Sequence, residues 1–194
     1  MPAIPKILIS EEAYLEEERK ALNKSEYYKG EIFAMAGATK AHNKIIASII
    51  SSIGKYLKGK SCSYFPGDLR VHNNKNSLYA YPDVTIVCGK EEYLDDEFDT
   101  LLNPTVLMEV LSPDTEDYDR GTKFKLYRSI PSLKNYIIVN SIEYAVEIFT
   151  RSENDEWILN IAKGNDDHIH ISAIEYDLLL ADIYSQADDL IPVK

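Results

Sequence analysis

The chain contains few residues of the types that crosslink a small protein or bind a structural metal. Two of its 194 residues are cysteines, and neither Cys62 nor Cys88 stands in a Cys-x-x-Cys motif or a Cys/His cluster. That spacing argues against a zinc site of the finger type. Both cysteines lie in short apolar runs, where a free thiol behaves as a small hydrophobe. We expect buried, reduced thiols, with a disulfide or a reactive thiol as the alternative.

The sequence also lacks long apolar stretches. No window approaches the roughly 20 apolar residues that a membrane span requires. Met1–Ser10 has one lysine, two prolines and no long apolar core, which does not match a signal peptide. We therefore expect a soluble, cytoplasmic protein with no membrane partner.

Positive charge is scarce as well. Lys and Arg number 21 against 32 Asp and Glu, for a formal net charge of −11. This balance disfavours tight, metal-free binding of nucleic acid, which draws on basic surfaces. It does not argue against a metal-dependent site, because such a site is built from carboxylates. The absence of a G-x-S-x-G elbow, a P-loop and a G-x-G-x-x-G motif disfavours the hydrolase and nucleotide-binding classes that use them.

What the sequence does contain is typical of one globular domain. Apolar residues make up 45% and charged residues 27% of the chain, and this length fits a single domain, residues 1–194. Helical spacing or capping signals predict helices beginning after Ser10, over His42–Leu57 and over Asp119–Arg128, with a closing helix or turn at Tyr176–Tyr184. Lys29-Gly30 predicts a hairpin turn, and Glu91–Asn103 an acidic loop or short helix.

Short apolar runs bounded by turn residues predict the strands of a sheet flanked by these helices, an α/β fold. The expected strands are Cys62–Phe65, Leu69–His72, Asp83–Cys88, Thr105–Leu111, Tyr136–Val139, Ala145–Phe149, Trp157–Ile161 and a short His168–Ile171.

Two of the predicted strands each carry one carboxylate in an apolar run. Asp83 opens Asp-Val-Thr-Ile-Val, and Glu109 lies between Met108 and Val110. A buried carboxylate needs a partner, a metal or a proton, because burying its charge alone is costly. For Asp83 a strand-edge turn acid following Pro82 is the plainer interpretation.

Downstream, Lys123 and Tyr127 stand four residues apart on the predicted helix and so project from one face. A hard divalent cation such as magnesium takes one or two carboxylates and completes its shell with water. A nearby ammonium orients water or offsets transition-state charge. Lys123 taken alone is more typical of a solvated helix charge.

The order of these segments resembles the restriction endonucleases of the Uma-two family, common in cyanobacteria and part of the PD-(D/E)XK nuclease superfamily. The matching pieces are the Pro-Asp strand, then Glu-Val-Leu-Ser-Pro, then a helix with Lys-x-x-x-Tyr. Further matches are Gly30-Glu31, Met35-Ala36-Gly37, the histidine at 42, and Leu133, Tyr136 and Val139. Each piece is weak alone, but their order and spacing together are specific.

The resemblance implies a restriction-endonuclease-like mixed sheet flanked by helices. It implies that Asp83 and Glu109, with the Val110 carbonyl, hold magnesium or manganese, and that Lys123 is the catalytic lysine. The superfamily places that lysine two residues after the glutamate, where this chain has Leu111. The lysine would therefore have moved to the helix, with Lys125 in reserve.

Three further residues are supporting candidates by resemblance. Glu31 is expected either as a third acid near the metal or as a surface charge of the hairpin. His42 either lines the cleft or caps its helix, and Tyr127 either reaches the site with its hydroxyl or is a core residue.

The sequence thus predicts a metal-dependent endonuclease that hydrolyses DNA phosphodiester bonds. The alternative is a degenerate module with the same fold that contacts protein or, weakly, nucleic acid, which the net charge and Leu111 favour. Cleavage of both strands of a duplex suits a homodimer. Tyr144, Phe149 and Trp157 in the late strands are its expected interface.

Overall fold

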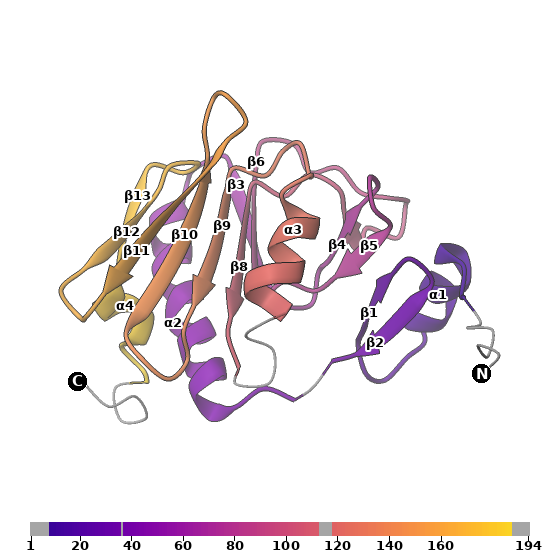
Figure 1. The fold of residues 1–194 in the computed structure, drawn as a ribbon, viewed down its shortest axis with the longest axis horizontal. Coiled ribbons are helices and arrows are strands. Elements are labelled where there is room, and N and C mark those ends of the chain that lie inside the picture. The colour runs from indigo at the N-terminus through magenta and orange to yellow at the C-terminus, as the bar shows by residue number, and fades with distance from the viewer. Residues whose placement is uncertain (1–7, 36, 113–117, 188–194) are drawn as a thin grey trace, which may run out of the picture.

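The structure is a computed structural model that describes residues 8–35, 37–112 and 118–187. Figure 1 shows one large sheet with a long helix behind it and a shorter helix on its near face, and the N-terminal hairpin set apart to one side. The chain forms a mixed α/β fold, as the sequence predicts. Its helices are α1 (Glu11–Glu18), α2 (Lys40–Leu57), a π-helical turn (Tyr118–Lys123), α3 (Phe124–Tyr127) and α4 (Leu180–Tyr184).

Thirteen strands lie between these helices within the described residues. They are β1 (Ser25–Tyr28), β2 (Glu31–Ala34), β3 (Cys62–Pro66), β4 (Arg70–Asn73), β5 (Leu78–Ala80), β6 (Val84–Cys88), β7 (Thr100–Leu101), β8 (Val106–Val110), β9 (Asn135–Val139), β10 (Ala145–Arg151), β11 (Trp157–Lys163), β12 (His168–Ile171) and β13 (Tyr176–Leu179). The six-stranded sheet has the order β11-β10-β9-β8-β6-β3, and a five-stranded sheet the order β2-β1-β5-β4-β7. β12 and β13 pair with each other.

One face of the six-stranded sheet packs against α2. Thr39 caps this helix by accepting from the His42 N–H, and Ile45, Ile49 and Ile53 are fully buried at helical spacing. They join the side chains of one face of β6, β8, β9 and β10, together with α4, in one apolar cluster. This face carries the main hydrophobic core.

The other face packs against α3 and the five-stranded sheet. Side chains alternate along β8, so Val106 and Met108 enter the α2 cluster while Leu107 enters the cluster with Leu126 and Tyr127 of α3. Glu109, one residue past Met108, therefore points to the α3 face.

Most predicted elements are confirmed, and the differences have local causes. The hairpin turn falls at Lys29 and Gly30, both with positive φ, as a two-residue turn requires. The short strands β5 and β7 were not predicted, because strands of two or three residues show little periodicity. Tyr176–Leu179 is a strand rather than the start of the closing helix, since it pairs with β12.

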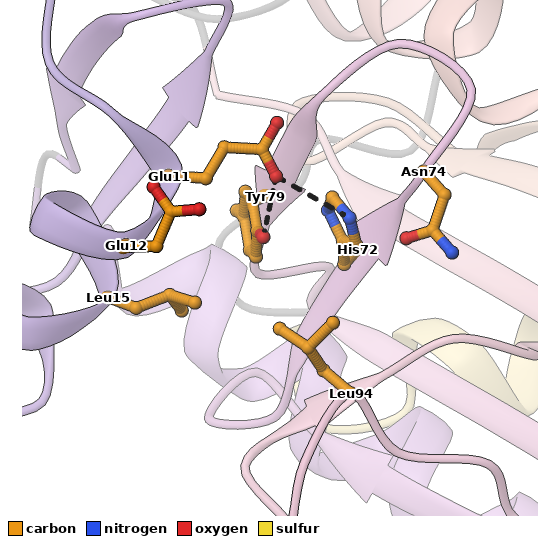
Figure 2. A pocket seen from close by; sticks show the side chains of 7 residues that line it. All are labelled: Glu11, Glu12, Leu15, His72, Asn74, Tyr79 and Leu94. Carbon is orange, nitrogen blue, oxygen red and sulfur yellow. Dashed lines mark hydrogen bonds and ion pairs between the residues drawn. The ribbon is translucent and has the colours of Figure 1, made fainter.

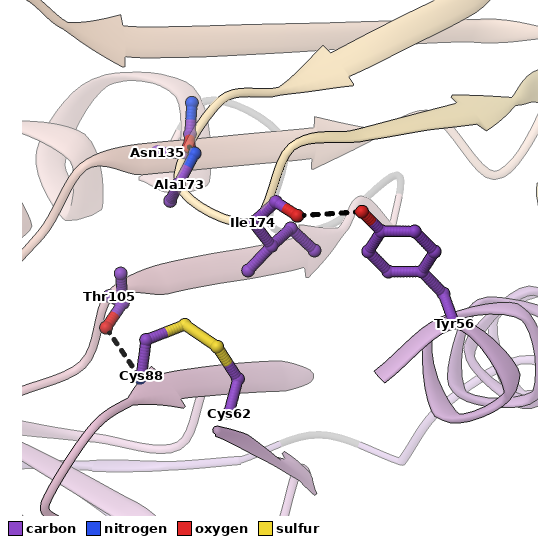
Figure 3. The surroundings of a disulfide bond; sticks show 7 residues. All are labelled: Tyr56, Cys62, Cys88, Thr105, Asn135, Ala173 and Ile174. Carbon is purple, nitrogen blue, oxygen red and sulfur yellow. Dashed lines mark hydrogen bonds between the residues drawn. A yellow bond between two sulfur atoms is a disulfide. The ribbon is translucent and has the colours of Figure 1, made fainter. Parts of the chain in front are cut away.

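The expectation of reduced cysteines is wrong for this structure. Cys62 and Cys88 form a disulfide (Figure 3), and the two residues lie directly opposite each other in the antiparallel pair β3–β6. Direct cross-strand neighbours bring their Cβ atoms within bonding reach. The sequence could not show this, because 26 residues separate the two and only the strand register brings them together.

The late aromatic residues pack partly within the chain, and all three are half-buried. Phe149 stacks on Phe124 of α3, Trp157 meets the same ring edge-on, and Tyr144 packs on Tyr184. Because part of each ring stays exposed, an interface at these three residues remains a prediction. None of the helices in the described part of the chain is long and apolar enough to cross a bilayer.

Candidate active site

Asp83 and Glu109 meet at one end of the β6–β8 pair. Val84 lies opposite Met108 and Thr85 opposite Leu107 in this antiparallel register. One further step along the register brings Asp83 opposite Glu109. Glu109 alternates with residues of the α2 core and points to the α3 face, and Asp83 lies close enough to raise the pKa of Glu109 by its charge.

Asp83 is held by contacts from two other elements. Its Oδ2 accepts a 2.7 Å hydrogen bond from the Val110 N–H, and Nε2 of His42 lies 3.1 Å from the same oxygen. His42 stands in the first turn of α2, and its ring is mostly buried. Its Nδ1 is buried without a hydrogen-bond partner among the described residues. His42, which the sequence predicts either to line the cleft or to cap its helix, thus contacts Asp83.

Lys123 lies at the centre of a buried group of charges. Its Nζ is 3.1 Å from Oε1 of Glu109, 3.1 Å from Oε1 of Glu26 and 3.4 Å from Oδ1 of Asp119. Only 6% of Lys123 is exposed, whereas Lys125 is exposed to solvent. Lys123 is therefore the lysine of this helix that contacts Glu109.

Two tyrosines fix the geometry of this group. Tyr127 donates a 3.1 Å hydrogen bond to Oε1 of Glu109, the oxygen that Lys123 also contacts. Tyr136 of β9 donates to the carbonyl of Asp119 at 3.0 Å. The π-helical turn ends at Lys123, and such turns often occur at functional sites.

The electrostatics follow from burial and from the excess of acids. Burial raises the pKa of Glu109 well above its ordinary value; Lys123 opposes this, while Asp119, Asp83 and Glu26 raise the pKa further. Burial lowers the pKa of Lys123, but the charges of its carboxylate neighbours outweigh it and raise that pKa overall. Lys123 thus stays charged, and Glu109 holds a proton more readily than an ordinary glutamate does.

Sequence analysis missed two acids of the group, Glu26 and Asp119. Glu26 lies in β1 between Ser25 and Tyr27, with 6% of its surface exposed. Like Asp83 and Glu109, Glu26 is a carboxylate beside large strand side chains, Tyr27 and Tyr28, and this is the signal that could have found it.

The structure places the other predicted residues as follows. Glu31 lies beside the hairpin turn, opposite Tyr28, whereas Glu26 of the same hairpin reaches Lys123. Leu111 is buried in the α3-side cluster. Two residues of the matched motifs, Ala36 and Pro113, lie outside the described residues.

The donor set suits a hard divalent cation. Asp83 and Glu109 offer carboxylate oxygens on facing strand positions, and the surrounding acids outnumber the lysine, so a cation there would relieve their repulsion. The contacts of Asp83 given above converge on Oδ2, and those of Glu109 on Oε1. Within the described residues, no group of three or more His, Cys, Asp or Glu forms a ready metal site. Magnesium needs only one or two carboxylates and water.

The sequence profile of the Uma2 family, described as "Putative restriction endonuclease", matches residues 11–181. The chain belongs to the Uma2 family. Two Synechocystis proteins are relatives of this Uma2 chain. The uncharacterized protein slr1290 is 33% identical over 158 residues, covering 81% of this chain and 82% of its own. The uncharacterized protein sll1609 is 31% identical over 170 residues, which cover 88% of this chain and 96% of sll1609.

The fold is also found in a crystal structure titled a "putative nuclease belonging to DUF820" from Anabaena variabilis. It superimposes with a TM-score of 0.75 over 92% of this Uma2 chain and 98% of that chain. At 16% sequence identity, this match shows the shared fold.

Proposed function

We propose that this Uma2 protein is a divalent-metal-dependent endonuclease that hydrolyses DNA phosphodiester bonds. The observation that carries the proposal is the convergence of three side chains. Asp83 lies opposite Glu109 in the strand register, and the ammonium of Lys123 lies 3.1 Å from Glu109. Two carboxylates and a lysine are the parts that metal-assisted phosphodiester hydrolysis requires. The family description supports the same class of reaction.

The residues that would hold magnesium or manganese are Asp83 and Glu109, with the Val110 carbonyl as a third oxygen. When bound, the ion would lower the pKa of a bound water and neutralise charge on the phosphate. The Val110 N–H and His42 hold the Asp83 carboxylate in place through Oδ2. Tyr127 does the same for Glu109 through Oε1.

Lys123 would act on the attacking water and on the phosphate oxygens. Lys123 keeps its charge despite burial, because its carboxylate neighbours raise its pKa. Its ammonium can hydrogen-bond the water that attacks phosphorus. It can also offset the negative charge that develops on the phosphate oxygens during the attack. His42, whose Nδ1 lacks a partner among the described residues, is a positioning residue for Asp83. Its free ring nitrogen also offers a contact to substrate.

DNA would be held weakly, because the chain carries a net charge of −11. Phosphate contacts normally draw on Lys and Arg. Binding should therefore depend on the metal and fall with added salt. EDTA should abolish both binding and cleavage.

The test is a cleavage assay on supercoiled and linear DNA with magnesium or manganese. Asp83→Asn and Glu109→Gln keep side-chain shape while removing ligand charge, so each should reduce cleavage about 100-fold or more. Lys125→Ala is the matched control, since Lys125 stands on the same helix but is exposed, and should cleave like wild type. Equal cleavage by wild type and both acid variants would show that a contaminating nuclease is responsible.

A second function is favoured by two observations: three carboxylates enclose Lys123, and a buried Leu111 stands where the superfamily usually has its lysine. Such a group could hold α3 and the hairpin on the sheet without catalysis. The protein would then be a non-catalytic module that contacts protein or nucleic acid. A folded wild type that is inert with both metals and all DNA forms would support this function over the first.

We also propose that the protein acts as a homodimer, because paired sites match the two strands of a duplex. The surface that suits this role is β11, the edge strand of the large sheet, with Ile158, Leu159 and Ile161 exposed by 45–54%. An edge strand with apolar side chains readily associates with another chain. Sedimentation should show a dimer at micromolar concentration, and Ile158→Lys should shift it to monomer. Monomer alone in wild type would rule the dimer out.

A further inference from the structure

A cavity lined by several polar side chains lies away from Asp83, Glu109 and Lys123. It has a volume of about 440 Å³ and lies between the first turn of α1 and strands β4 and β5. Figure 2 shows Glu11 and Glu12 on one side of it and His72, Asn74 and Tyr79 on the other. The proposed nuclease function uses none of these residues.

His72 has a defined tautomer in this cavity. Its ring is 5% exposed and stacks on Tyr79 with centroids 3.9 Å apart. Nδ1 lies 2.9 Å from the Leu78 carbonyl oxygen. A carbonyl oxygen only accepts, so Nδ1 must carry a hydrogen, which leaves Nε2 of the neutral ring as an acceptor.

Nε2 points at a second acceptor. Its nearest polar contact in the described residues is Oε2 of Glu11 at 3.8 Å, beyond hydrogen-bond reach (Figure 2). Burial lowers the pKa of His72 and so favours its neutral form, although the Leu78 carbonyl and Glu11 oppose this. Two acceptors that face each other this closely call for a shared cation or donor.

We propose that this cavity binds a divalent transition-metal ion of the zinc class, with His72 Nε2 and a Glu11 carboxylate oxygen as ligands. Metal-bound histidines donate their other N–H to a carbonyl or carboxylate, as Nδ1 does here to Leu78. Ligating carboxylates are likewise hydrogen-bonded, and Tyr79 donates to Oε2 of Glu11 at 2.9 Å. Both ligands thus have the outer partners that such sites use.

The spacing favours a metal over an organic cation. Ligands at about 2.0–2.2 Å from a tetrahedral zinc ion lie roughly 3.4 Å apart. An ammonium that donates two hydrogen bonds of about 2.9 Å would hold its acceptors roughly 4.7 Å apart. The 3.8 Å between Nε2 and Oε2 is nearer the metal value, and Glu11, one-third exposed at a helix start, can move to close the gap.

The protein supplies only part of the coordination shell. Among the described residues, no third His, Cys, Asp or Glu joins this pair. Water and the amide oxygen of Asn74, which lines the cavity, would complete it.

The test is calorimetric titration of zinc into the full-length protein, with cobalt(II) absorption as a second readout of coordination by nitrogen and oxygen. Wild type should bind one equivalent at this site. His72→Gln and Glu11→Gln should weaken binding at least tenfold, and Tyr79→Phe about tenfold, the size expected for loss of an outer partner. His170→Gln is the matched control, since His170 also pairs with an acid, Asp177, but is half exposed. It should bind zinc like wild type.

Two comparisons make the result decisive. Asp83→Asn should keep the one equivalent of zinc that His72 and Glu11 hold, even if zinc bound at the proposed nuclease site is lost, which separates the two sites. Glu11→Gln changes a partly exposed side chain, so it remains informative if His72→Gln does not fold. Zinc affinity unchanged in Glu11→Gln, binding lost in Asp83→Asn, or no binding by wild type would each overturn the proposal.

Discussion

The two faces of the six-stranded sheet differ in kind. The face toward α2 and α4 is lined almost wholly by aliphatic side chains, with Ile49, Met108 and Ile137 fully buried. The face toward α3 buries Glu109 and Lys123 in the same layer as Leu107 and Tyr127. The same strands contribute to both faces, because their side chains alternate.

The aliphatic α2 face accounts for the stability of the fold, whereas the charged α3 face carries the candidate chemistry. Burial of aliphatic surface stabilises the fold at about 25 cal/mol per Å². Burial of charge has a desolvation cost that ion pairing at best roughly offsets. A group of three acids and a lysine in the α3 face therefore adds little to stability, so a role in function is the better reason for it.

The largest expected effect comes from breaking the charged group. Lys123→Met leaves Glu26, Glu109 and Asp119 without their cation and should destabilise the fold by about 3–5 kcal/mol, the cost of an unpaired buried charge. Denaturant unfolding measures this. Replacing Glu109 as well, in Lys123→Met/Glu109→Gln, should restore part of the loss. If Lys123→Met is as stable as wild type, the three acids do not carry the negative charge around Lys123 that this account requires.

A core substitution on the α2 side should lower the free energy of unfolding by a comparable amount without changing the candidate site. Ile49→Ala removes a fully buried side chain and should cost about 2–5 kcal/mol. The folded fraction should keep the wild-type cleavage rate and metal affinity. Loss of metal affinity in folded Ile49→Ala would show that the two faces are coupled rather than separate.

The disulfide between Cys62 and Cys88 packs against the apolar cluster on the α2 side and should contribute to stability alone. Reduction should cost about 2–4 kcal/mol, because the bridge closes a long loop in the unfolded chain. Thermal unfolding with and without reductant measures this, and Cys62→Ser/Cys88→Ser should no longer respond to reductant. Two free thiols in the native protein would contradict the bridge.

The smallest effect concerns pH. Because the folded pKa of Glu109 lies above its unfolded value, the protonated acid adds stability that is complete below about pH 4.3. That stability is lost as pH rises to the folded pKa. In EDTA, wild type should thus lose more stability than Glu109→Gln over this range. The charged groups facing Glu109 are Lys123, Asp119, Asp83 and Glu26, and all four are present in both proteins. Identical pH profiles would argue against a raised pKa.

The sequence predicted the strands and helices that bring Asp83, Glu109 and Lys123 together, because periodicity and helical spacing are local. It predicted Glu109 as a partner of Lys123 but not Glu26 or Asp119. Glu26 reaches the lysine from the distant hairpin, whereas Asp119 stands four residues before it, a helical spacing that could have been recognised. The disulfide depends on the register of β3 against β6. Glu26 and the disulfide were therefore missed because both depend on how segments far apart in the sequence are placed relative to one another.

The central claim is that Asp83 and Glu109 together hold a divalent metal ion. Calorimetric titration of manganese into wild type, Asp83→Asn and Glu109→Gln tests it directly, with Lys125→Ala as the control. We predict binding by wild type and by Lys125→Ala, at least tenfold weaker binding by each acid variant, and tighter binding as pH rises because protons compete for Glu109. Manganese affinity that is the same in all four proteins would contradict the account.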